Sequence, residues 1–247
     1  AKADGTIVDL VGGLADIESQ TLRFIGDAEQ RIREDYLRIL RFFRFFAFYG
    51  RGRPDADGLR ASARLKDGLS GLSAERVRAE LLKLLAAPDP SRALLWMRQA
   101  GVLTAILPES EKWGIDAIHG LVSAERDLEW KADPLLRLEA IVPPDAARMV
   151  GLGERLRLSN AEAERLQRWA LTPPLSAQTS EAAFAKMLYR GDQQGLADRL
   201  KLALSSARAS ASLVDAGGYS RLLRFMDSWE RPTFPISGKD LMEQGAK

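Results

Sequence analysis

The sequence predicts a mostly α-helical protein. Beyond residue 26, apolar residues recur three and four positions apart, which is the period of an amphipathic helix. Stretches rich in Gly, Pro, Ser and Asp separate these segments and mark the turns between helices. The chain has 247 residues, 46% hydrophobic and 28% charged, a composition typical of a globular protein with a sizeable core.

The composition excludes several kinds of site. There are no cysteines and His119 is the only histidine, so disulfides, thiolate metal sites and histidine clusters on zinc are ruled out. No apolar run approaches the ~20 residues that span a membrane. The start, AKADGT, has no features of a signal peptide. We therefore expect a cytoplasmic protein with no membrane partner. The net charge of +2 neither favours nor excludes nucleic acid.

Residues 4–25 differ from the rest of the chain. The runs TIVDLVGG and LRFIG predict two short strands, joined by a turn and a brief helix over GGLADIESQ. Two strands are too few to be stable alone, so we expect them to belong to a sheet whose other strands lie outside this sequence. The first residue is not methionine, and the sequence stops just after a helix start that Ser237 would cap. We therefore expect a piece of a longer protein.

The helices follow in order. Asp27 as N-cap and Gly50 as terminator predict one long helix between them, and Ser73 caps another. A Pro-rich linker is predicted at 172–178. Single helices are predicted at 57–67, 114–130, 133–142, 180–190, 192–208 and 210–229. Two short helices are predicted on either side of Gly101, and two more within 143–170, the second of which is capped by Ser159 or Asn160.

The long helix carries an unusual polar face. On a helical wheel of about 100° per residue, one broad sector is apolar, with Ile32, Tyr36, Ile39, Leu40, Phe43, Phe46 and Ala47. The opposite sector holds Glu34, Asp35, Arg38 and Arg41, and Arg44 continues the three-residue spacing. Beside these charges stand aromatic residues, namely Phe42, Phe45 and Tyr49.

Two interpretations of this face are open. The first is a solvated helix face, because Glu34–Arg38 and Asp35–Arg38 are ion pairs at spacings that stabilise a helix by roughly 0.2–0.5 kcal/mol each. The second is a ligand site. A carboxylate accepts hydrogen bonds and a guanidinium donates them, so Asp35 with Arg38 matches an amine beside a ring-nitrogen acceptor. Cytosine and adenine present that edge, whereas uracil and guanine do not. The further arginines would meet phosphate oxygens.

The residues resemble a known family at this point. Residues 33–45, REDYLRILRFFRF, resemble the EDxxR nucleotide-recognition motif of the tRNA nucleotidyltransferase / poly(A) polymerase family, in its class II (bacterial, CCA-adding) form. The family's GG motif, which joins a catalytic head to a neck, is similar to DLVGGLADIESQTLRFIGD, and its later neck motif to LSAERVRAELLKLL. Stretches of its body and tail resemble ALLWMRQAGVLTAILPE and FPISGKDLM. The resemblance covers nearly the whole chain.

The resemblance implies helical neck, body and tail domains after a short β remnant of the head. The implied ranges are 1–26 for the remnant, 27–88 for the neck, 89–173 for the body and 174–247 for a truncated tail. It implies nucleotide binding by Asp35, Arg38, Arg41 and Arg44, with Glu34 holding Arg38. The other implied supports are Gly12, Gly13 and Asp16 at the head–neck hinge and Ser73, Arg76 and Glu80, which brace the base-reading helix.

Two features depart from the family pattern. Tyr36 stands where the family usually has proline after the Glu-Asp pair, so we expect the helix to start earlier, near Asp27. The family's catalytic carboxylates, which bind Mg²⁺, would lie upstream of Ala1, so no catalytic or metal-binding residue is expected here. Asp55 and Asp57 share the spacing of a metal pair but lie in a turn after the base-reading helix.

The implied activity is template-independent addition of nucleotides, CCA or A, to RNA 3′ ends, with ATP and CTP as substrates and a tRNA or another RNA as partner. In the full-length protein this would be an enzyme, while the residues present here would select the base and bind RNA without catalysing transfer alone. The residues leave open a non-catalytic all-α RNA-binding module or a helical interaction scaffold. They also leave open CCA addition, CC addition, A addition or poly(A) synthesis, and the oligomeric state.

Overall fold

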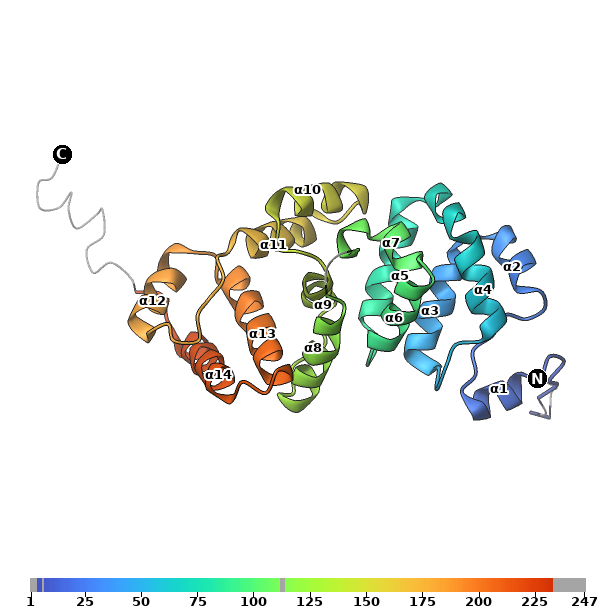
Figure 1. The fold of residues 1–247 in the computed structure, drawn as a ribbon, viewed down its shortest axis with the longest axis horizontal. Coiled ribbons are helices and arrows are strands. Elements are labelled where there is room, and N and C mark those ends of the chain that lie inside the picture. The colour runs from blue at the N-terminus through green and yellow to red at the C-terminus, as the bar shows by residue number, and fades with distance from the viewer. Residues whose placement is uncertain (1–3, 6, 112–113, 233–247) are drawn as a thin grey trace, which may run out of the picture.

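The structure is a computed structural model that describes residues 4–5, 7–111 and 114–232. The described residues form an elongated array of helices, with α1 and α2 at one end and α12 and α14 at the other (Figure 1). The predicted mostly α-helical fold is confirmed. The helix start predicted at Ser237 lies outside the described residues.

The first half of the array runs from the blue to the green helices of Figure 1. Its elements are α1 (Gly13–Ser19), α2 (Ala28–Glu34), α3 (Leu37–Tyr49), α4 (Ala56–Leu65), the 3₁₀ helix η1 (Lys66–Gly71), α5 (Ala74–Leu85), α6 (Ser91–Gln99), α7 (Val102–Ile106) and the 3₁₀ helix η2 (Pro108–Ser110).

The second half runs from the green to the red helices. Its elements are α8 (Asp116–Asp127), α9 (Pro134–Ile141), α10 (Ala146–Arg155), α11 (Asn160–Leu171), α12 (Glu181–Arg190), α13 (Gln193–Ala209) and α14 (Leu213–Ser228).

Local capping explains where many helices begin. A Ser or Asp side chain accepts a hydrogen bond from a backbone N–H in the first turn, which satisfies a donor that has no partner inside the helix. At α11 the capping is reciprocal, because the Glu162 carboxylate also accepts from the Ser159 N–H. The predicted caps Asp27, Ser73 and Ser159 are confirmed. The full set is Asp27, Asp55, Ser73, Asp133, Asp145, Ser159, Ser180 and Asp192.

Two hydrophobic cores hold the array together. The larger one extends from Ala28 in α2 to Trp169 in α11, and α3 contributes Ile39 and Phe43, which are fully buried. Within it α3 packs on α5 and α6, and α5 packs on α9. The smaller core lies among α12, α13 and α14 around Phe184 and Leu222. The larger core continues across residue 88, and the predicted domain ranges stay predictions.

The predicted strands in residues 4–25 are wrong for the part of the chain that the structure describes. Residues 7–9 and 21–24 are irregular, and no described residue lies in a strand. The two runs do not form a ladder with each other, and apolar side chains such as Leu10 and Ile17 are exposed. A two-stranded pairing needs further strands or a packed face to be stable. Leu22 and Phe24 pack against the larger core, but no described residue supplies a strand beside them.

The predicted single helix from Asp27 to Gly50 is also wrong. The chain breaks at Asp35, whose backbone is extended (φ −158°, ψ 107°), so that α2 ends at Glu34 and α3 begins at Leu37. The Asp35 side chain accepts a hydrogen bond from the Leu37 N–H at 3.1 Å and so starts the second helix. Tyr36, in the family's proline position, therefore stands at a helix start, as proline does.

The Tyr36 ring packs against Gly68 of η1, and this contact favours the break between α2 and α3. A Cβ atom added at Gly68 would overlap the Tyr36 ring. Gly68→Ala is therefore expected to lower the free energy of unfolding by about 1–3 kcal/mol, the usual cost of overpacking, as measured by urea denaturation. Gly71→Ala is the matched control in the same 3₁₀ helix, because a Cβ there meets nothing within 4 Å. Equal stabilities of the two variants would show that Tyr36 does not need this space.

Within the described residues, none of the helices combines the length and the apolar character needed to cross a membrane.

Candidate functional site

The site predicted from the sequence lies at the junction of α2 and α3. Asp35 occupies the break between these helices, Glu34 is the last residue of α2, and Arg38 lies in the first turn of α3. The side chains of Asp35 and Arg38 are 27% and 28% exposed, so both can be reached from solvent. The break thus places a carboxylate and a guanidinium three residues apart at a helix start.

Asp35 is held by α5. Arg76 Nη2 donates to both carboxylate oxygens of Asp35, at 3.1 Å and 2.8 Å. Partial burial alone would raise the pKa of Asp35, but the hydrogen bonds from the Leu37 N–H and from Arg76 outweigh it, and the pKa lies below the ordinary value. Asp35 is therefore an ionised acceptor at neutral pH, and a carboxylate keeps lone pairs for a further donor.

Arg38 is held by α2. Its Nη1 atom donates to the Arg31 carbonyl at 2.7 Å and to Glu34 Oε2. Glu34 also accepts from Arg31 at 2.6 Å, so one carboxylate joins two arginines. The hydrogen bond from Arg38 is the main reason that the pKa of Glu34 is lowered. Both described contacts of Arg38 use Nη1, which leaves Nε and Nη2 to a ligand.

The side chains of Asp35 and Arg38 do not form the ion pair that the first interpretation of the helix face includes. Asp35 pairs with Arg76 and Arg38 pairs with Glu34. The break at Asp35 explains the difference, because residues three apart lie on one face only when both belong to the same helix. The predicted pairing of Glu34 with Arg38 is present.

Arg41 and Arg44 converge on a single buried carboxylate. Arg41 Nε lies 3.3 Å from Glu80 Oε1, and Arg44 Nε lies 2.8 Å from Glu80 Oε2. The side chain of Glu80 is only 6% exposed, while that of Arg41 is 45% exposed. The N–H of Arg44 is not directed at the oxygen, so this contact is an ion pair without a directed hydrogen bond. The Arg44 guanidinium also stacks 4.3 Å from the centre of the Phe45 ring.

The aromatic wall beside the arginines is smaller than predicted. Phe45 and Tyr49 are 39% and 64% exposed, in agreement with the helical wheel. Phe42 is only 4% exposed and stacks on Phe24, with 5.2 Å between the ring centres. Packing of the segment before α2 against α3 therefore turns Phe42 into a core residue.

The residues predicted for the head–neck hinge gather around α1. Gly12 has φ 75°, in the left-handed region that glycine adopts readily. Asp16 accepts from Arg23 Nε at 2.7 Å. The Gly13 and Leu14 N–H groups donate to Asp9 at 2.8 Å and 2.9 Å, and these bonds lower the pKa of Asp9.

Two further residues support these clusters and were not predicted from the sequence. The Asp9 carboxylate accepts from the first N–H groups of α1, although Gly12 is the N-cap residue. Its position a few residues before a glycine pair was a usable signal, because Asp side chains often accept from backbone N–H groups nearby in the chain. Arg31 supports both Glu34 and Arg38. Its spacing of three residues from Glu34 was a second usable signal.

Two hollows flank the α2–α3 unit. One of 820 Å³ lies between α2 and α4 and is lined by Glu34, Arg33 and Arg64 among others. The second, of 500 Å³, lies between α1 and the end of α3 and is lined by Gly13, Asp16 and Tyr49 among others. Neither is lined by Asp35 or Arg38. Among the described residues, no three acidic or histidine side chains converge as they would on a metal ion.

Comparisons with known proteins find similarity to one family model and to several CCA-adding enzymes. A family model described as "Probable RNA and SrmB- binding site of polymerase A" matches residues 55–113. The mouse protein "CCA tRNA nucleotidyltransferase 1, mitochondrial" is 29% identical over 256 residues, which cover 98% of this chain and 54% of that protein. The Geobacillus stearothermophilus "CCA-adding enzyme" is 39% identical over 105 residues, 42% of this chain and 25% of that protein.

A solved structure of a CCA-adding enzyme has a similar fold. The structure described as "Bacillus stearothermophilus CCA-adding enzyme in complex with CTP" superposes with a TM-score of 0.70 and 24% identity, over 100% of this chain and 61% of that chain. The chain therefore spans about half the length of the mouse relative and somewhat more of the solved structure.

Proposed function

We propose that the chain belongs to the tRNA nucleotidyltransferase / poly(A) polymerase family, and that it selects the nucleotide base and binds RNA for an enzyme that extends RNA 3′ ends. The observation that carries the proposal is the pair Asp35 and Arg38 at the α2–α3 break, each partly exposed and each fixed by a separate partner. The names of the relatives favour tRNA as the RNA and CCA as the added sequence.

The proposed chemistry is recognition of a Watson–Crick edge. Asp35 is ionised at neutral pH, so it accepts from the exocyclic amine of cytosine or adenine. Arg38 donates to the neighbouring ring nitrogen through an N–H that Glu34 does not use. Uracil and guanine would place a carbonyl against the carboxylate and an N–H against the guanidinium. A buried mismatch of that kind costs more than a missing hydrogen bond.

The supporting residues have separate parts in the proposal. The recognition cluster consists of Asp35, Arg38, Arg41 and Arg44. Arg76 and Glu80 of α5 fix all of it except Arg38, which Glu34 holds. Ser73 is the N-cap of α5, and its side chain accepts a hydrogen bond from the Arg76 N–H, which helps to orient Arg76. Gly12, Gly13 and Asp16 would form a hinge.

The resemblance also implies Mg²⁺, which would neutralise the leaving pyrophosphate. The described residues do not fit such an ion, because no cluster of carboxylates converges among them. We therefore assign no chemical step to a metal here. A cytoplasmic location stays a proposal, because the mitochondrial names of some relatives do not support it.

A nucleotide titration of the chain tests the proposal. In NMR titrations, CTP and ATP are expected to bind more tightly than UTP and GTP, by about tenfold, because one well-placed bidentate contact discriminates bases by about 1–3 kcal/mol. Asp35→Ala and Arg38→Ala are expected to remove this difference.

The matched control is an ion pair with the same spacing on α4. Asp57→Ala and Arg60→Ala remove an exposed pair three residues apart and are expected to leave the preference intact. Salt-sensitive RNA binding with equal affinity for all four triphosphates would instead identify an RNA-binding module. Binding of neither RNA nor triphosphates would identify an interaction scaffold.

A further inference from the structure

Helix α5 links the recognition cluster to the second half of the array. Near its start, Arg76 holds Asp35, and one turn later Glu80 holds Arg41 and Arg44. Its last residue, Leu85, lies about 14 Å from Arg76 along the helix axis, at 1.5 Å per residue. A helix is stiff over this length, so whatever fixes its end also fixes the position of Arg76 and Glu80.

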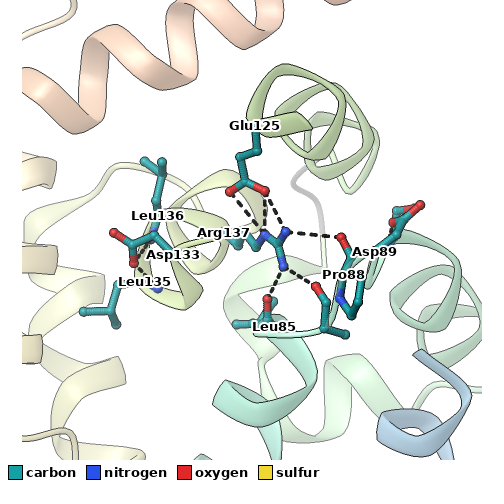
Figure 2. Close-up of polar contacts among 10 residues, drawn as sticks. Leu85, Pro88, Asp89, Glu125, Asp133, Leu135, Leu136 and Arg137 are labelled. Carbon is teal, nitrogen blue, oxygen red and sulfur yellow. Dashed lines mark hydrogen bonds and ion pairs between the residues drawn. The ribbon is translucent and has the colours of Figure 1, made fainter. Parts of the chain in front are cut away.

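Arg137 of α9 fixes that end. Its Nη1 atom donates to the Leu85 carbonyl at 2.5 Å and to the Ala87 carbonyl at 2.6 Å, and Nη2 approaches the Pro88 carbonyl at 3.5 Å. Figure 2 shows the guanidinium between these carbonyls on one side and Glu125 of α8 on the other. The last carbonyls of a helix have no partner inside it and carry a partial negative charge, so a guanidinium is a well-matched cap.

Glu125 in turn fixes Arg137. Its carboxylate accepts from Nε at 3.0 Å and 3.2 Å and from Nη2 at 2.6 Å, a two-pronged contact (Figure 2). The side chains of Arg137 and Glu125 are only 2% and 5% exposed. Buried charges of this kind are held in one geometry, because every displaced hydrogen bond would leave a buried polar group without a partner.

A second contact joins α5 to the same half. Arg78 donates through Nη1 to the Arg157 carbonyl at 2.5 Å and lies 3.7 Å from Glu162 of α11. Arg78 is more exposed than Arg137, with 30% of its side chain accessible. The end of α5 is thus the buried attachment, and Arg78 is the peripheral one.

We propose that Arg137, held by Glu125, is a positioning residue for base selection: it fixes the end of α5 and thereby the placement of Asp35, Arg41 and Arg44. The inference rests on the proposed function, because it concerns how the residues of the same site are held in position. Arg137 contacts no nucleotide in this scheme, and its effect passes through Arg76 and Glu80. Base selection would therefore depend on the packing of α8 and α9, far from the recognition cluster in the sequence.

The test is Arg137→Lys, which keeps the charge beside Glu125. A lysine ammonium lacks the planar fork of a guanidinium and cannot hold a carboxylate and two carbonyls together. We expect the ratio of the UTP and CTP dissociation constants to fall about threefold or more. We also expect the backbone amides of residues 77–81 to exchange hydrogen about tenfold faster, because the end of α5 is freed.

The matched control is Arg165→Lys. Arg165 of α11 also binds two carboxylates, Asp198 and Asp133, but does not touch α5. It is expected to lower the melting temperature while leaving the nucleotide ratio and the exchange of residues 77–81 unchanged. Unchanged ratio and exchange in Arg137→Lys, or equal changes in Arg165→Lys, would overturn the inference. If the unsubstituted chain binds all four triphosphates equally, base selection has failed, and the exchange rates alone decide whether Arg137 positions α5.

Discussion

Arg137→Met is expected to lower the free energy of unfolding by about 3–5 kcal/mol, the usual cost of breaking a buried ion pair by removing one partner. Glu125 would remain buried without its counter-ion, and the carbonyls of Leu85 and Ala87 would lose their donor. Methionine fills a similar volume, so the loss reflects unpaired polar groups more than a cavity. Urea denaturation followed by circular dichroism measures the change.

A double variant separates the charge from the shape. Glu125→Leu with Arg137→Met removes both charges and is expected to recover much of the lost stability, because apolar replacement of a whole buried pair is often neutral or stabilising. The control is Arg126→Met on the same helix, whose side chain is 77% exposed, with an expected change within about 0.5 kcal/mol. A loss of less than about 1 kcal/mol in Arg137→Met would show that the pair is not held as the structure places it.

Local signals carried most of the helix predictions. Asp27, Ser73 and Ser159 could be assigned as caps because capping depends on residues within one turn. The break between α2 and α3 could not be predicted in this way. It depends on the Asp35 side chain accepting from Leu37 and on Tyr36 packing against Gly68, and the second contact joins segments that periodicity does not relate.

The site was predicted in part. Motif resemblance pointed to Glu80 and Arg76 as supports, but only the fold shows that Arg76 binds Asp35, 41 residues away, and that Glu80 binds two arginines. Phe42 was predicted on the wrong face because a helical wheel describes a single helix and does not include the contact with Phe24. Charged residues inside the apolar run LLRLEAIV, residues 135–142, were a usable signal for burial, because charges are fully buried only when paired or neutralised.

Both charged residues of that run are buried, but in opposite ways. Arg137 is fully paired, whereas Glu139 is 1% exposed and neither of its carboxylate oxygens has a hydrogen-bond partner among the described residues. Burial raises the pKa of Glu139 well above its ordinary value, and the negative charge of Asp198 raises it further. The other charges that act on it are Asp133, which also raises the pKa, and Arg165 and Arg199, which partly offset the rise.

The contribution of Glu139 to the stability of the protein should therefore fall as the pH rises. Below the ordinary pKa of 4.5, Glu139 is protonated in both the folded and the unfolded state, and its contribution is fully present. Above that pH the unfolded chain loses the proton while the folded chain keeps it, so the free energy of unfolding drops by up to about 1.4 kcal/mol per pH unit until the folded pKa is passed.

Glu139→Gln isolates this contribution. Glutamine has nearly the shape of a protonated glutamate and does not titrate, so the variant is expected to gain stability relative to the unsubstituted chain as the pH is raised from 4 towards 8. Urea denaturation at each pH gives the difference between the two chains, which cancels the titration of all groups that they share. Parallel stability curves would mean that Glu139 titrates alike in both states, and a difference that shrinks with rising pH would mean that the folded protein prefers the carboxylate. Since the negative charge of Asp198 contributes to the raised pKa of Glu139, Asp198→Asn in the chain that keeps Glu139 is expected to weaken the same slope.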